Sequence, residues 1–213
     1  MLLFDYFPEL LKGLATTFEL AAIGLAMGFV LGWILVLLRK YGGKVLSPIA
    51  TAYVEFIRGT PMLVQLFIIY FGLVEYGIDN FTAAFLTLGI NSGAYQSEYF
   101  RQGIESIGQG QIIAARAIGM NRLQIIRHII LPQAIRIALP AWSNEAAYLP
   151  KYGVVAFAIA VQDILSKAKW IVPTWSVSPL EVYGMVALLF VICISAISKI
   201  LDIVYKRVKI PGF

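Results

Sequence analysis

Polar and ionisable side chains recur at helical spacing within two otherwise apolar segments of this 213-residue chain. Residues 81–105 carry two adjacent polar faces, formed by Asn91, Tyr95 and Glu98 and by Ser92, Gln96 and Tyr99. Residues 133–160 carry a third polar face with a carboxylate beside it, formed by Asn144, Tyr148, Lys151 and Glu145. Carboxylates can bind an ammonium or guanidinium group while a lysine or a helix amide binds a carboxylate, which is the chemistry of a zwitterion site. The candidate substrate-binding residues are therefore Tyr95, Gln96, Glu98, Asn144, Glu145, Tyr148 and Lys151.

The same ionisable groups have a second interpretation as structural ion pairs. An ionised group near the centre of a bilayer is energetically costly, so it must be paired or face a watery cavity. Glu98, Glu145 and Lys151 could pair with one another or with Arg101 and Arg136, and would then hold a helical bundle together. The residue pattern leaves both interpretations open.

The chain that must position these side chains is too apolar for a water-soluble globule. Hydrophobic residues make up 60% of it, charged residues 14%, and its mean hydropathy is +0.80. A helix needs about 20 apolar residues to cross the hydrocarbon core of a bilayer. We therefore predict an all-α integral membrane protein, with residues 1–213 forming one transmembrane domain of about five spans, at approximately 14–38, 48–76, 81–105, 133–160 and 179–204.

The distribution of charge predicts the orientation of these spans. Basic residues cluster after the first, third and fifth spans, at Arg39, Lys40 and Lys44, at Arg116, Arg122 and Arg127, and at Lys206, Arg207 and Lys209. By the positive-inside rule these clusters are cytoplasmic, so the N-terminus is predicted outside and the C-terminus inside. Topology accounts for the net charge of +5, and no nucleic-acid partner is implied.

Proline predicts a bend in the second span. Pro61 has no backbone N–H to donate to the carbonyl of Ile57, so the helix should kink there, with the hydroxyl of Thr60 able to satisfy that carbonyl. A kink at this position fits either a gating role or simple packing of an interfacial segment.

Between the third and fourth spans the sequence predicts two short helices that meet at a glycine. Ile112, Ala115 and Ile118 form an apolar face on the first helix, and Gly119 is expected to end it. Asn121 and Gln124 have the spacing of a capping box that starts the second helix. We call residues 108–132 the elbow. An ordinary cytoplasmic loop is the alternative, but amphipathic helical spacing on both sides of a glycine favours docking into a groove of a cytoplasmic partner.

The elbow resembles the conserved "EAA" loop of bacterial and archaeal ABC importer permeases. The matching positions are Ala114, Ala115, Gly119, Ile129, Leu131 and Pro132. Ile113 stands where that family has glutamate, so a salt contact of that glutamate with the ATPase is not expected here, while the elbow itself is still expected.

Three further segments resemble the polar amino acid permeases within that family. They are "EFIRGTPMLVQLFIIYFGL" at 55–73, "YQSEYFRQGIESI" at 95–107, and "NEAAYLPKYGVVAFAI" from Asn144. In the last segment Asn144, Glu145 and Lys151 match the family, whereas Tyr152 and its two successors replace a typical Asp-Thr-Ser. This departure affects the identity of the ligand more than the class of protein.

The resemblance implies the permease subunit of an ATP-driven importer of polar amino acids in the plasma membrane, working by alternating access. It implies a cytoplasmic ATP-binding subunit that carries ATP and Mg, and an extracellular substrate-binding protein that docks on outer loops such as 161–178. A second copy of this chain or a related permease, an amino acid and membrane lipid complete the expected partners. The elbow residues expected to couple to the ATPase are Ala114, Ala115, Arg116, Gly119, Met120 and Arg122.

No catalytic role is expected for the chain itself. It has no phosphate loop, no HExxH and no nucleophile elbow, and His128 has no second histidine or cysteine near it in sequence, so no metal ligand set and no bound cofactor are predicted. An alternative function is an ATP-independent channel or carrier for a small polar solute, in which the elbow tethers or regulates. A membrane-embedded enzyme is a more distant alternative.

Overall fold

The computed structural model describes residues 2–209, which form helices joined by short turns and contain no strand. The all-α membrane architecture predicted from composition is confirmed. In chain order the elements are α1 (Leu2–Tyr41), α2 (Gly43–Arg58), α3 (Met62–Leu73), η1 (Val74–Tyr76), α4 (Asn80–Glu105), α5 (Gln109–Ala117), α6 (Arg122–Ile125), η2 (Ile126–Ile130), α7 (Leu131–Gly153), η3 (Val154–Ile159), α8 (Ile164–Trp175) and α9 (Pro179–Val208).

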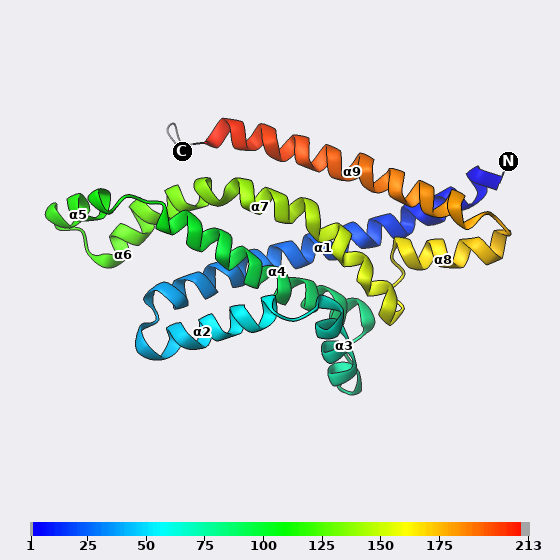
Figure 1. The fold of residues 1–213 in the computed structure, drawn as a ribbon, viewed down its shortest axis with the longest axis horizontal. Coiled ribbons are helices and arrows are strands. Elements are labelled where there is room, and N and C mark those ends of the chain that lie inside the picture. Colours follow the sequence, from blue (N-terminus) through cyan, green and yellow to red (C-terminus); the bar gives the residue numbers. More distant parts are fainter. Residues whose placement is uncertain (1, 210–213) are drawn as a thin grey trace.

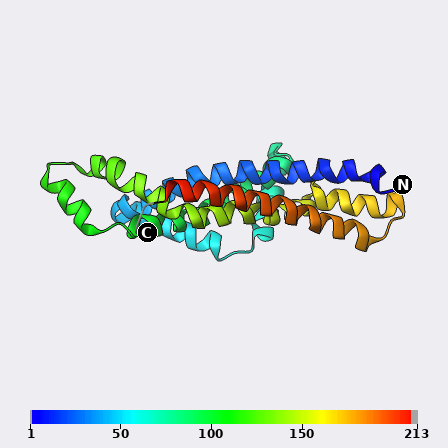
Figure 2. The ribbon, with the colours of Figure 1, turned by 90° about the horizontal axis from the view of Figure 1, so that it is seen from above.

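The long helices run side by side, and the elbow extends from one end of the bundle (Figure 1). The N-terminus and α8 lie at the opposite end, and the view from above shows the same separation (Figure 2). The C-terminal end of α9 returns to the elbow end. All three basic clusters that predicted the cytoplasmic side therefore gather at one end of the molecule.

Helix α1 is much longer than the predicted span of 14–38. It has 40 residues, and at a rise of about 1.5 Å per residue it is about twice as long as a bilayer core is thick. Its first turns are held by α8 and α9, because Tyr6 and Leu10 are fully buried against those helices. Tyr6 also donates a hydrogen bond to Glu181 at 2.7 Å, and Lys167 binds Glu9 at 2.8 Å.

Small residues bring α1 and α4 into close contact. A Cβ on Gly24 would lie 2.7 Å from Leu88, and one on Gly28 would lie 2.7 Å from the side-chain amide of Gln96. Gly89 and Gly93 of α4 are equally close to side chains of α1. Glycines spaced by four thus let the two backbones approach, as they do in many membrane helix pairs.

The second span is broken rather than kinked. Residues 48–76 were predicted to form one span, but α2 and the segment Met62–Tyr76 meet at an angle of 106°. Pro61 lies in the break with extended backbone geometry. The helix does not continue through it because proline has no backbone N–H to donate to the carbonyl of Ile57. The carbonyl of Ile57 accepts hydrogen bonds from Gln65 at 2.7 Å and from Thr60 at 3.3 Å. The freed carbonyl is therefore satisfied mainly by Gln65, which the sequence prediction did not include.

The fourth span and the segment that follows it also differ from the prediction. Residues 133–160 were predicted as one span, but regular α-helix ends at Gly153 and continues as the tighter helix η3 to Ile159. Helix α8 then forms within residues 161–178, which were predicted as a loop. Asp163 caps α8 by accepting the backbone N–H of Ser166 at 2.8 Å.

By length and apolar composition alone, α1 and α9 qualify as membrane spans, and the bent pair α2 and α3 adds a third. Helices α4 and α7 are long enough, with 26 and 23 residues, but they are more polar. The polar groups of α4 lie inside the bundle: its buried polar residues are Thr87, Asn91, Ser92, Gln96, Ser97 and Glu98. Helix α7 buries Glu145 in the same way but leaves Asn144 and Lys151 exposed.

Candidate functional site

The elbow has the two-helix form that the sequence predicted. Gly119 adopts the left-handed conformation with φ of +85°, and the backbone N–H of Met120 donates to the carbonyl of Ala115 at 3.1 Å, which closes the end of α5. Asn121 and Gln124 form the capping box that starts α6, with hydrogen bonds of 2.9 and 2.8 Å. The predictions of a glycine stop and a capped second helix are confirmed.

The elbow has one face packed on the bundle and one face exposed. Ala115, Ile125 and Ile130 are buried with Phe100 and Ile104 of α4. The exposed apolar side chains of the elbow are Ile113, Ile118 and Leu123, at 65%, 79% and 71% exposure. The predicted apolar face of Ile112, Ala115 and Ile118 is divided, because α5 ends at Ala117 and Ile118 is exposed in the following turn while Ala115 is buried. A firmly anchored elbow thus carries an apolar outer surface that suits a partner protein.

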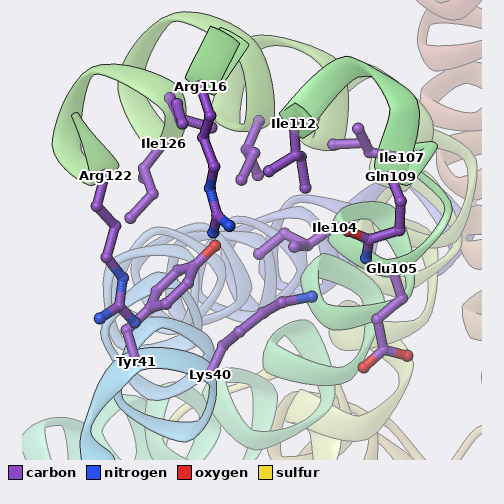
Figure 3. A pocket seen from close by; sticks show the side chains of 12 residues that line it. Lys40, Tyr41, Ile104, Glu105, Ile107, Gln109, Ile112, Arg116, Arg122 and Ile126 are labelled. Carbon is purple, nitrogen blue, oxygen red and sulfur yellow. The ribbon is translucent and has the colours of Figure 1, made fainter. Parts of the chain in front are cut away.

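The residues predicted to couple to an ATPase occupy different places in the elbow. Ala114 is exposed, Ala115 is buried, Met120 is half-buried and Gly119 forms the exposed turn. Arg116 and Arg122 line a cavity between the elbow and the end of α1, where both side chains extend toward Tyr41 (Figure 3).

A second cavity, of about 410 Å³, opens among α3, α4 and α7. Its wall combines the break in the second span with polar and aromatic side chains of both polar helices: Thr60, Pro61, Met62, Asn91, Tyr95, Tyr99, Glu145, Tyr148 and Tyr152. We call this the membrane cavity. It brings together Tyr95, Glu145 and Tyr148 of the predicted binding residues. No cluster of three or more histidine, cysteine or acidic side chains suited to a metal ion occurs within residues 2–209.

Among residues 2–209, Glu145 is the only carboxylate in the wall of the membrane cavity. Its two oxygens accept hydrogen bonds from Ser92 at 2.7 Å and from Tyr99 at 3.1 Å. No basic side chain of residues 2–209 lies within 4.0 Å of it. A buried carboxylate held by neutral donors in an open cavity can attract a cationic group from a ligand.

Gln96 lies behind this carboxylate and is fully buried. Its amide donates to Ser92 at 2.9 Å and to the carbonyl of Leu25 at 3.1 Å, and its oxygen accepts the indole N–H of Trp142 at 2.9 Å. Gln96 therefore orients Ser92 and joins α1, α4 and α7, but it does not line the cavity.

Glu98 lies outside the membrane cavity, at the centre of an arginine cluster. It hydrogen bonds Arg39, binds Arg101 at 2.8 Å, and lies 3.7 Å from Arg58. The contacts of Glu98 thus fit the interpretation as a structural ion pair. Arg101 was an expected partner, and Arg39 of α1 and Arg58 of α2 are two additional ones.

The remaining predicted site residues, Lys151 and Asn144, are both exposed and do not line the cavity. The ammonium group of Lys151 lies 3.8 Å from the ring centroid of Tyr148, over its face. Sequence reasoning did not select Tyr99, Tyr152 or the break residues Thr60 to Met62. The polar face that includes Tyr99 and the proline at the break were the signals that could have found them.

Comparisons with known proteins agree with this architecture. Residues 24–209 match the family described as binding-protein-dependent transport system inner membrane component. The nopaline transport system permease protein NocM of Agrobacterium fabrum is 37% identical over 93% of this chain and 87% of its own length. The glutamine transport system permease protein GlnP of Escherichia coli K12 is 35% identical over 95% of this chain and 94% of its own length.

Solved structures show the same fold. A crystal structure of an amino acid ABC transporter with histidines has a TM-score of 0.89 and 34% sequence identity, and covers 96% of both chains. An inward-facing structure of the MetNI methionine ABC transporter has a TM-score of 0.80 at 23% identity, which indicates likeness of fold. The chain therefore belongs to the family of binding-protein-dependent transport system inner membrane components, the permeases of ABC importers.

Proposed function

We propose that this permease carries a polar amino acid through the membrane cavity and is driven by ATP hydrolysis in a separate subunit. One observation carries the proposal: α4 and α7 both line the cavity, and the elbow is the connection between them. A force applied to the elbow therefore reaches the two helices that hold Tyr99 and Glu145.

The physical route is a rigid joint rather than a flexible loop. The inner face of the elbow is packed on α4 through Ala115, Ile125 and Ile130, so the elbow and α4 move together. Its exposed Ile113, Ile118 and Leu123 offer an apolar surface to an ATP-binding subunit. Closure of that subunit on ATP and Mg would rotate α4 and α7 and expose the cavity alternately outward and inward.

The chemistry of the cavity supports an amino acid that bears a cationic or amide-bearing side chain. Glu145 can accept an ammonium, guanidinium or amide group, and the rings of Tyr95, Tyr148 and Tyr152 can surround a cation. The relatives named nopaline and glutamine permeases are transport systems for such polar solutes.

Assembly with a second permease and an external binding protein completes this proposal. This chain encloses the membrane cavity only in part, and five spans alone can hardly enclose a solute path, so two copies or two related permeases are expected to meet around it. The outer layer of α8 and the first turns of α1 and α9 offers a surface for a substrate-binding protein. In the orientation we propose, the N-terminus is outside, and the elbow and the C-terminus are in the cytoplasm.

A substitution at the elbow turn tests the mechanism. Gly119→Val forces a β-branched residue into a left-handed backbone at φ of +85°, whereas Gly110→Val places the same residue in an exposed position of α5 without that strain. We expect Gly119→Val to abolish ATP-dependent uptake into proteoliposomes and to lose co-purification of the ATPase, while Gly110→Val retains both. Uptake that persists in the Gly119 variant, or without ATP, would show an ATP-independent channel or carrier instead.

A further inference from the structure

A cavity beneath the elbow is lined by several basic side chains. Its volume is about 220 Å³, and it lies between the elbow and the ends of α1 and α4 (Figure 3). Three basic residues from three different elements line it: Lys40 from the last turn of α1, Arg116 from α5 and Arg122 from α6. We call it the elbow cavity.

The elbow cavity has an excess of positive charge. Of the described residues, Glu105 is the only carboxylate in its wall, and Arg101 already binds Glu105 at 2.6 Å. Within residues 2–209, none of the three lining cations has a carboxylate oxygen within 4.0 Å. The guanidinium carbon of Arg122 lies 4.6 Å from the ring centroid of Tyr41, which orients this cation without neutralising it.

The rest of the wall is apolar, with two neutral polar side chains. The apolar lining consists of Ile104, Ile107, Ile112, Ile125, Ile126 and Ile130. Tyr41 and Gln109 add a hydroxyl and an amide. A ligand that fits this wall carries an anionic group at one end and an apolar part at the other.

We propose that the elbow cavity binds a phosphate-bearing anion, with the phosphate held by Lys40 of α1 and Arg116 of the elbow, while Arg122 adds positive charge beside Tyr41. Phosphate suits this set because guanidinium groups bind it through paired hydrogen bonds and lysine binds it as a point charge. The chemistry admits an anionic lipid headgroup or a free phosphate from the cytosol. The isoleucine wall and the position at the ends of the transmembrane helices favour the lipid.

Such a ligand would bridge the elbow to α1. Lys40 belongs to the long helix that anchors the bundle, whereas Arg116 and Arg122 belong to the elbow, so one phosphate joins the two bodies. A bound phosphate would make the elbow less mobile relative to α1, and the elbow is the segment that we propose moves α4 and α7. The anionic lipid content of the membrane would thereby regulate the response of the permease to its ATPase.

The binding test uses the purified full-length chain in nanodiscs of phosphatidylcholine. One arm adds phosphatidylglycerol and the other adds inorganic phosphate, and the readouts are the thermal unfolding temperature and the number of lipids retained in native mass spectrometry. We expect the unfolding temperature to rise with phosphatidylglycerol, because a ligand that binds only the folded state stabilises it. A rise with inorganic phosphate alone would assign the site to the free anion and still support it.

Matched variants assign the binding to the elbow cavity. Lys40→Gln combined with Arg116→Gln should weaken binding about tenfold or more, which is the scale of losing charge-assisted hydrogen bonds. Lys44→Gln combined with Lys206→Gln removes the same charge from exposed positions outside the cavity and should leave binding unchanged. Lys40→Gln alone provides a milder variant if the double variant unfolds in phosphatidylcholine.

The inference is overturned if neither probe stabilises the chain, or if both double variants lose binding equally, since that result indicates a diffuse surface charge effect. Neither readout requires ATP, an ATPase or a transported solute. Failure of this inference therefore leaves the proposed transport function untouched, and failure of the transport function leaves the binding result standing.

Discussion

Tyr99 of α4 donates a hydrogen bond to Glu145 of α7 at 3.1 Å, at the wall of the membrane cavity. This contact links the two helices that the elbow connects, and it fixes a carboxylate whose neighbours are neutral. In the function that we propose, this carboxylate is the group that meets a cationic substrate.

Replacing Glu145 tests its role toward a cationic substrate. Glu145→Gln keeps an oxygen acceptor for Ser92 or Tyr99 but removes the charge. We expect uptake of arginine or lysine to fall about tenfold or more, the scale of one charge-assisted hydrogen bond, with a smaller effect on glutamine. Initial rates in proteoliposomes measure this. Glu55→Gln, at an exposed position near the end of α2, is the matched control, and equal losses in both variants would contradict the assignment.

Replacing Glu98 tests a structural role. Glu98→Gln leaves Arg39, Arg58 and Arg101 without their shared carboxylate. We expect the free energy of unfolding to fall by about 2–4 kcal/mol, below the full cost of breaking a buried pair because two of the arginines are partly exposed. Thermal unfolding in detergent measures the change.

Glu105→Gln is the control for this prediction, because Glu105 is 50% exposed and pairs with Arg101 alone. Its loss should cost less than about 1 kcal/mol. Equal destabilisation by the two variants would show that Glu98 is no more important to the fold than a surface pair. A change in substrate preference in Glu98→Gln at unchanged stability would place it in the transport path instead.

The end of the permease that contains α8 should respond to pH through Asp163. Burial raises the pKa of Asp163 from 3.8 to about 6, and within residues 2–209 its Oδ2 atom has no hydrogen-bond partner. The folded state therefore keeps a proton that the unfolded chain releases, so the stability from this group is present at pH below 3.8 and is lost as pH rises toward about 6. Asp163→Asn should flatten this part of the stability profile, measured by thermal unfolding at several pH values.

Asp79 provides a control of opposite sign. It caps α4, and hydrogen bonds from Thr82 hold the pKa of its carboxyl below the usual value of 3.8. Its contribution is therefore present above that value and is lost as pH falls through the lowered pKa. Asp79→Asn should leave the slope between pH 4 and pH 6, approximately, unchanged. The same flattening in both variants would contradict the role of Asp163.

The features that were predictable from the sequence depend on neighbours within one helical turn. The two residues of the capping box, Asn121 and Gln124, are three positions apart, and the turn at Gly119 favours a residue without a Cβ. Both features can therefore be recognised from the sequence alone. The break at Pro61 follows from the missing N–H of that residue. Its angle and the role of Gln65 could not be predicted, because they depend on how α3 packs against α4.

The sequence alone determined a helical membrane protein with a polar interior and a two-helix elbow. It did so through the length of its apolar segments, the distribution of its basic residues and its capping motifs. Each of these depends only on how a short stretch of chain interacts with lipid or water. Only the tertiary structure decided that Glu98 meets Arg39, 59 positions away, whereas Glu145 meets Tyr99 at the cavity. The physical reason is that both carboxylates have polar neighbours on their own helices. Which carboxylate meets a basic side chain depends on how far each helix is shifted and rotated against the others. The three basic residues of the elbow cavity also come from distant parts of the chain. Their spacing in the sequence does not predict that they line one cavity.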